Sequence, residues 1–96
     1  MNAIIVVQAK GKDAEKLAAY SQAALPIVAA HQGELFLRAP VVEVMSGESD
    51  FEKVILLKFP SVDAARNWYN SEEYQALIPL REEGADMVFT LLEVPD

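Results

Sequence analysis

Hydrophobic and polar positions divide the chain into stretches of two kinds. Four stretches are rich in β-branched and aromatic residues and have the short apolar pattern of β-strands. The second of them is broken by Ala39-Pro40, and a proline there predicts a bend or bulge in an edge-like strand. The predicted strands cover Ala3–Ala9, Glu34–Arg38 with Val41–Ser46, Glu52–Phe59 and Asp86–Val94.

The first region of helical spacing lies between the first two predicted strands. Asp13 is a suitable N-cap, and from there small and medium apolar residues recur along one stripe as far as Val28. Pro26 lies inside this stripe and removes the hydrogen bond to the carbonyl of Gln22, which predicts a kink or a restart. Gly33 suits the C′ position, so we expect the helix to end beside it.

The second helical region follows Pro60, which ends the third predicted strand. Ser61 is placed to begin one helical segment and Ser71 to cap another, while Pro79 interrupts the pattern again and Gly84 ends it. The resulting order, β-α-β-β-α-β, predicts an α+β, ferredoxin-like fold. In this fold a four-stranded antiparallel sheet carries its helices on one face.

One face of the predicted sheet carries more aliphatic side chains than contact with water favours. Side chains alternate across a strand, and an antiparallel sheet with one wet face normally alternates between apolar and polar residues. Here the face away from the helices holds six large aliphatic side chains, and covering them is worth roughly 12 kcal/mol at about 2 kcal/mol each. We therefore expect homodimerisation through this open face. The residues assigned to it are Ile4, Val6 and Gln8; Val54, Leu56 and Lys58; and Val88, Thr90 and Leu92.

Composition narrows the possible partners. The chain has 96 residues, 52% of them hydrophobic, with no cysteine and a single histidine, so disulfides are impossible and a zinc site is not expected. Small domains without disulfides or bound metals are often stabilised by oligomerisation. The net charge of −7 argues against nucleic acid and anionic membranes as partners. No apolar run is long enough to span a bilayer and no signal peptide is recognisable, so a cytoplasmic location is the default expectation.

Several short motifs indicate a protein family more specifically than composition does. They are Phe59–Ala65, Trp68-Tyr69, Ser71–Tyr74 and Arg81 in the second half of the chain, and Tyr20, His31–Gly33, Phe36–Arg38 and Val42–Val44 in the first half. These motifs extend over nearly the whole chain. With them the chain resembles domain-of-unknown-function family 1330 of the dimeric α/β-barrel superfamily. The resemblance implies that residues 1–96 form a single ferredoxin-like domain and that two copies pair sheet to sheet. The chain departs from the family at Gly33-Glu34 and Ala39-Pro40, where glycine pairs are common, and both departures affect the second strand.

The resemblance leaves three functions open, because the family is functionally uncharacterised and a fold does not determine an activity. Members of the superfamily include cofactor-independent monooxygenases of aromatic polyketides, small-lactone isomerases, haem enzymes and ligand-binding regulatory domains. The first hypothesis is a small-molecule enzyme that needs no cofactor and oxygenates or isomerises an activated carbonyl compound in a cleft between helices and sheet. The second is a non-catalytic ligand-binding or stress-associated dimer that uses the same cleft. The third is a structural dimer module without a pocket.

The candidate catalytic residue is His31, the one side chain that titrates near neutrality without perturbation. It also fits the ordinary role of a cation near a helix C-terminus. Arg38 and Arg81 are planar cations suited to binding a carboxylate or enolate of a small organic ligand. Either arginine can instead pair with one of the 15 acidic residues. No metal-ligand set and no cofactor motif is recognisable.

Three aromatic residues at helical spacing, Trp68, Tyr69 and Tyr74, are the remaining candidates for ligand binding. They can fill the space between helix and sheet, or they can stack a flat ligand in a partly open cleft. Tyr20, on the other helix, faces either the same cleft or solvent. A tyrosine phenol has a pKa near 10, so it would donate a hydrogen bond or a proton more readily than act as a base.

Overall fold

The computed structural model describes residues 2–95, and its elements follow the predicted order. They are β1 (Asn2–Gly11), α1 (Ala14–Ala30), β2 (Glu34–Pro40), β3 (Lys53–Phe59), α2 (Val62–Tyr69), α3 (Glu72–Gln75), α4 (Ile78–Gly84) and β4 (Ala85–Val94). The second helical region is therefore divided into α2, α3 and α4, with serine caps at the two predicted places, Ser61 and Ser71.

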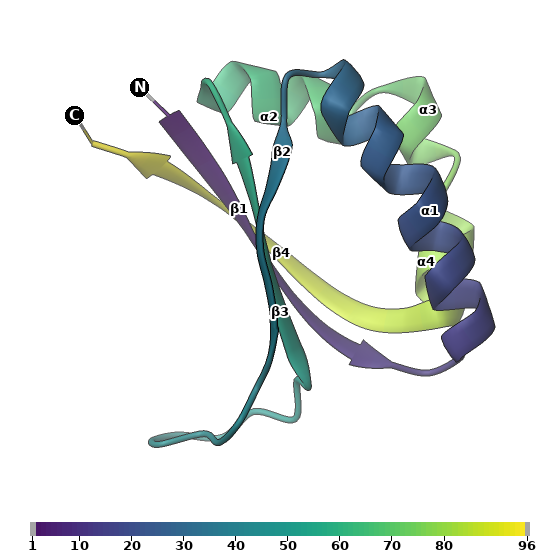
Figure 1. The fold of residues 1–96 in the computed structure, drawn as a ribbon, viewed down its shortest axis with the longest axis vertical. Coiled ribbons are helices and arrows are strands. Elements are labelled where there is room, and N and C mark those ends of the chain that lie inside the picture. Colours follow the sequence, from purple (N-terminus) through teal and green to yellow (C-terminus); the bar gives the residue numbers. More distant parts are fainter. Residues whose placement is uncertain (1, 96) are drawn as a thin grey trace.

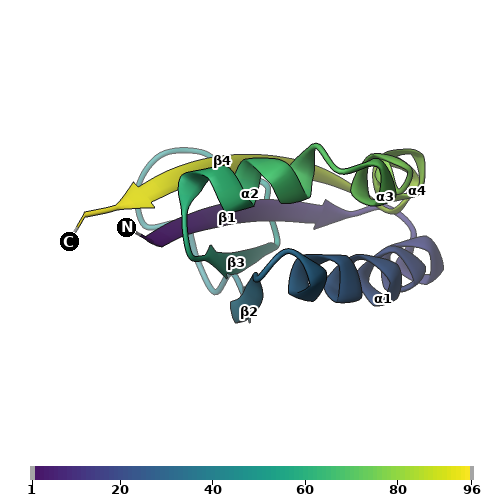
Figure 2. The ribbon, with the colours of Figure 1, turned by 90° about the horizontal axis from the view of Figure 1, so that it is seen from above.

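The four strands form an antiparallel sheet in the order β2-β3-β1-β4. All four helices lie on the same side of it, which leaves the other side without a covering helix within residues 2–95 (Figure 1, Figure 2). The predicted α+β, ferredoxin-like fold is confirmed. No helix in this part of the chain is long and apolar enough to cross a membrane.

The core lies between the helices and the sheet and is largely aromatic. Trp68, Tyr74 and Phe59 are the largest fully buried side chains. The ring centre of Trp68 lies 4.4 Å from that of Tyr74 and 5.5 Å from that of Phe59. Ile5 and Val7 of β1 are buried beneath them, so the side chains that alternate with the predicted open-face residues of this strand lie in the core.

The opposite face has the composition predicted from the alternation of side chains. Val6 of β1 lies between Leu56 of β3 and Thr90 of β4 in the register of the sheet. The three predicted sets therefore share one face. Val88 and Leu92, at its β4 edge, are each 45% exposed, so this face presents aliphatic side chains to whatever covers it.

The second strand differs from the prediction. β2 continues through Ala39-Pro40 and ends there, and Val41–Ser46, expected to continue the strand, is irregular. Pro40 has no N–H to donate, and after one hydrogen bond from the N–H of Val41 to the carbonyl of Glu52 (2.8 Å) the chain leaves the sheet as a long loop (Figure 1). The bulge expected at this proline lies in the first half of β2 instead.

The start of α1 follows the prediction. Asp13 is the N-cap, and its Oδ1 accepts hydrogen bonds of 3.1 Å from the backbone N–H groups of Glu15 and Lys16. The helix continues through Pro26 to Ala30 as one element, so the predicted restart does not occur.

The end of α1 is built differently from the prediction. The residue with positive φ is Gln32 (φ 67°), not Gly33, and the N–H of Gly33 closes the turn on the carbonyl of Val28 at 2.9 Å. Gly33 is required for a different reason: a Cβ there would lie 2.5 Å from the ring of Phe59. Close packing therefore explains this glycine better than backbone conformation does.

We predict that Gly84→Ala destabilises the protein by about 2 kcal/mol or more, because overpacking a close contact forces the backbone apart. A Cβ on Gly84 would lie 2.8 Å from the backbone nitrogen of Leu17, where α4 approaches α1. The free energy of unfolding in urea measures the effect. Gly11→Ala is the matched control, because a Cβ at that position meets nothing closer than 3.8 Å. Equal stability of the two variants would contradict the prediction.

Candidate functional site

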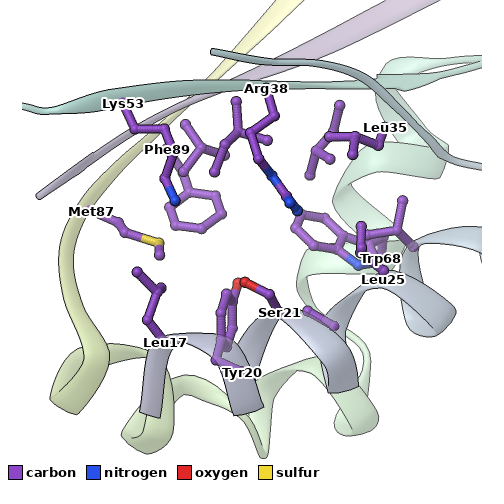
Figure 3. Close-up of a pocket in the computed structure, with 15 residues that line it drawn as sticks. Leu17, Tyr20, Ser21, Leu25, Leu35, Arg38, Lys53, Trp68, Met87 and Phe89 are labelled. Atoms are coloured by element: carbon purple, nitrogen blue, oxygen red, sulfur yellow. The ribbon is translucent and has the colours of Figure 1, made fainter. Parts of the chain in front are cut away.

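A cleft lies between α1 and the helix-facing side of the sheet (Figure 3). Its cavity volume is about 50 Å³, within about 510 Å³ of space that includes its open mouth, so the cleft is narrow. Most of its wall is apolar or aromatic, which is typical of small-molecule sites. The apolar lining residues are Val7, Leu17, Ala24, Leu25, Val28, Leu35, Ile55, Leu57, Trp68, Met87 and Phe89.

Arg38 reaches this cleft because β2 carries a bulge. The register shifts between Leu35 and Leu37, which inserts one extra residue into the strand. A shift of one residue exchanges the two faces of a strand. Arg38 consequently lies opposite Ile55 and lines the cleft; without the bulge it would point to the open face.

Lys53 contributes a second cation from the start of β3. It lies opposite Ala9, a buried residue of the helix-facing side, so its side chain also lines the cleft. In Figure 3 the side chains of Arg38 and Lys53 extend from the sheet toward α1, and the hydroxyl groups of Tyr20 and Ser21 extend from α1 toward the sheet. The polar groups of the cleft thus come from both of its walls.

The charge of the cleft is opposite in sign to the net charge of the chain. The whole sequence has a net charge of −7, yet the residues that line the cleft include two cations and no acid. Within residues 2–95 neither Arg38 nor Lys53 forms an ion pair. The ion pairs of this part of the chain are Lys10–Asp50, Lys12–Asp86, Lys16–Glu83 and Arg81–Glu82.

A chain of hydrogen bonds lies behind the cleft. Nη1 of Arg81 donates to the phenol oxygens of Tyr74 (2.9 Å) and Tyr69 (3.2 Å). The phenol oxygen of Tyr74 lies 2.7 Å from that of Tyr20, whose ring lines the cleft. The Cζ atom of Arg81 is also 4.7 Å from the ring centre of Phe89, another lining residue. Arg81 therefore supports the cleft wall from behind.

Burial keeps the phenols of Tyr20 and Tyr74 protonated. It raises the pKa of both groups above the ordinary value of 10.0. The charge of Arg81 favours the ionised form of both, but burial outweighs it. At neutral pH both tyrosines are therefore hydrogen-bonding groups and not bases.

The family model described as domain of unknown function DUF1330 matches residues 2–95. The chain belongs to this family. No curated protein matches this DUF1330 chain. Within residues 2–95 no three histidine, aspartate or glutamate side chains are placed to hold a metal ion.

Solved structures similar to the DUF1330 chain support its fold. A protein of unknown function from Rhodopseudomonas palustris, RPA0582, has a TM-score of 0.83 at 17% identity, covering 99% of this chain and 83% of the other. SnoaB, a cofactor-independent oxygenase from Streptomyces nogalater, has a TM-score of 0.72 at 11% identity, covering 99% and 94%. A dimeric ferredoxin-like protein of unknown function from Jannaschia has a TM-score of 0.69 at 13% identity, covering 98% and 100%. At these identities the similarity establishes the fold alone.

The structure distributes the predicted site residues of the DUF1330 chain among three places. Arg38 and Trp68 line the cleft. Tyr74 and Arg81 belong to the hydrogen-bond chain behind it, as does Tyr69, which also lines a neighbouring hollow between α2 and the sheet.

His31 lies apart from these groups, at the C-terminal end of α1. Its Nδ1 is 2.9 Å from the carbonyl oxygen of Ile27. It lines a shallow depression that shares no residue with the cleft. The structure of the DUF1330 chain therefore does not bring the candidate catalytic residue to the cleft, and its catalytic role stays a prediction.

Sequence reasoning did not select two polar residues of the cleft, Ser21 and Lys53. A signal for both was present. Lys53 continues the alternating set of Ile55 and Phe59 on β3, and Ser21 lies within the apolar stripe of α1. Each is a polar side chain within an otherwise apolar set that faces the interior of this DUF1330 chain.

We predict that Tyr20 and Tyr74 ionise only when the chain unfolds in alkali. A pKa that is higher in the folded state favours folding fully below pH 10, and this contribution is lost as the pH rises above that value. Tyrosinate absorbance and circular dichroism, followed together, should show two of the three tyrosines ionising in step with unfolding. In denaturant all three should titrate together near pH 10. Reversible ionisation of all three in the folded protein would contradict the assignment.

Proposed function

We propose that the protein binds a small, flat, apolar organic anion in the cleft between α1 and the sheet. The observation that carries this proposal is a pair of cations, Arg38 and Lys53, which face an apolar cleft and have no acidic partner within residues 2–95. The charged oxygen of the ligand would lie between them. Its apolar body would pack against Trp68 and Phe89, which line the inner wall.

Physical chemistry supports an anion over a neutral ligand. Two cations near one apolar cleft repel each other, and an oxyanion between them removes that repulsion. Hydrogen bonds to charged groups are each worth about 1.5–3 kcal/mol, more than those between neutral groups. The cleft also supplies a place for a ligand, which the hypothesis of a purely structural module does not require.

We propose binding, not turnover, as the function of this cleft. None of its lining residues is a carboxylate or an imidazole. Burial raises the pKa of the Tyr20 phenol, so this phenol stays protonated at neutral pH and is not available as a base. His31 would have to act from a different depression. The oxygenase activity named for SnoaB is the alternative, and consumption of a bound ligand in air would favour it.

We expect naphthalene-2-carboxylate to bind and naphthalene-2-carboxamide, its neutral isostere, to bind at least about tenfold more weakly. Calorimetry or ligand-induced thermal stabilisation measures both affinities. Arg38→Met and Lys53→Met should each weaken carboxylate binding by about tenfold or more. Arg66→Met is the matched control, because it removes an equal charge from an exposed position of α2 outside the cleft. Equal affinity for the carboxylate and the amide would contradict the proposal.

We also propose that two copies of the chain pair through the open face of the sheet. Aliphatic side chains cover this face in every strand, and Leu37 of β2 (46% exposed) extends it opposite Leu56. A large exposed apolar patch of this kind is typical of an interface. Similar structures from Jannaschia, Thermobifida fusca and Bacteroides fragilis are described as dimeric.

The dimer proposal predicts a dimer in sedimentation at micromolar concentration. Leu56→Lys should convert it to monomer, because it places a cation from each copy in the apolar interface. Ala18→Lys is the control, since it adds an equal charge on an exposed position of α1. A monomeric parent protein, or a Leu56→Lys variant that remains dimeric, would contradict pairing through this face.

A further inference from the structure

We propose that the ligand of the cleft is a phenol or enol bound as its anion, and that the hydroxyl of Tyr20 donates a hydrogen bond to its charged oxygen. The Arg81–Tyr74 pair would act as the positioning pair that directs this hydroxyl. The inference rests on the proposed function, because it specifies the chemical class of the anion and the third group that recognises it.

The direction of the hydrogen bond between the two tyrosines follows from counting protons. The side chain of Tyr74 is fully buried, with 0% exposure, so its hydroxyl proton needs an acceptor. Its two hydrogen-bond partners in the described part of the chain are Arg81 and Tyr20. A guanidinium group has no acceptor atom. Tyr74 must therefore donate to Tyr20 across the 2.7 Å contact.

The same count leaves the hydroxyl proton of Tyr20 without an acceptor in residues 2–95. The phenol oxygen of Tyr20 accepts from Tyr74, which is its sole hydrogen-bond partner within residues 2–95. The residue lines the cleft, and its oxygen points toward the sheet, from which Arg38 extends (Figure 3). Chains of hydrogen bonds polarise one another, so the charge of Arg81 strengthens the donor that Tyr20 presents to the cleft.

Trp68 supplies a second donor without an acceptor. It is 1% exposed and lines the cleft, and its Nε1–H has no hydrogen-bond partner within residues 2–95. A buried donor without a partner is costly. Within residues 2–95 the cleft is thus lined by donors without an acceptor: the Tyr20 hydroxyl, the Trp68 indole, Arg38 and Lys53. The Ser21 hydroxyl, which can donate or accept, is the remaining polar group of the wall.

This set of donors favours an oxygen anion that is part of a flat conjugated frame. A phenolate or enolate carries its charge on the flat frame that packs against the aromatic walls, so its oxygen would lie inside the cleft, where the Tyr20 hydroxyl is. A carboxylate at the end of a flexible chain could be held at the mouth by the two cations alone. Because these donors and cations stabilise the deprotonated oxygen more strongly than the neutral hydroxyl, the cleft should make a bound phenol more acidic.

The test uses 4-nitrophenol, whose absorbance distinguishes the phenol from the phenolate. Titration of the bound probe in the full-length protein should give an ionisation constant at least about tenfold larger than that of the free probe, since each charge-assisted hydrogen bond is worth that much. Tyr20→Phe should reduce this increase by about tenfold, and Tyr74→Phe should reduce it in part. Tyr69→Phe is the matched control: it removes a phenol that accepts from Arg81 but leaves the bond between Tyr74 and Tyr20.

The outcomes separate this inference from the proposed function. If 4-nitrophenol binds to the parent protein with an unchanged ionisation constant, the cleft binds small apolar ligands but the inference is wrong. An equal effect of Tyr69→Phe and Tyr20→Phe would also contradict it, because that result would indicate a general structural role for these phenols. If neither the nitrophenol nor naphthalene-2-carboxylate binds, the proposed function itself fails. The measurement on the parent protein decides the question even if a variant does not fold.

Discussion

The hydrogen-bond chain behind the cleft joins all four helices. Tyr20 comes from α1, Tyr69 from α2, Tyr74 from α3 and Arg81 from α4. Three of these helices have eight residues or fewer, and short helices have little stability of their own. A single guanidinium that donates to two phenols fixes their positions over the sheet. α1 forms one wall of the cleft, and the contact of Tyr20 with Tyr74 ties this wall to the other helices.

Charge is distributed so that the cleft differs from the rest of the molecule. Exposed lysines near the ends of the strands and helices pair with acids, and such pairs contribute little to stability. Arg38, which is exposed, and Lys53, which is half-buried, line an apolar cleft without an ion-pair partner in residues 2–95. A binding role gives this arrangement a reason.

Much of the fold could be predicted from the sequence because it follows from local rules. The alternation of Val6 and Leu56 with their core-facing neighbours determined both faces of the sheet, and Asp13 marked the start of α1. The segment Val41–Ser46 could not be assigned correctly in this way. It has the β-branched pattern of a strand, but pairing depends on a partner strand, which the pattern of one segment does not reveal.

The candidate site was harder to predict, because side-chain direction depends on long-range structure. Arg38 and Trp68 were selected for their chemistry, and both line the cleft. The position of His31 depends on where α1 ends, and the sequence suggested Gly33 where the structure has Gln32 in the left-handed conformation. Lys53 was not among the predicted site residues, although its place in the alternation of β3 put it on the core-facing side.

The bulge between Leu35 and Leu37 makes the two faces of β2 sensitive to the deletion of a single residue. One residue more or less in β2 exchanges the two faces of the strand beyond it. Loss of the extra residue would transfer the guanidinium of Arg38 from the cavity to the apolar open face, and would turn an aliphatic neighbour inward in its place. A single-codon deletion would thus remove a charge from one surface and add it to another. The proposed ligand site and the proposed dimer interface are in this sense coupled through the register of one edge strand.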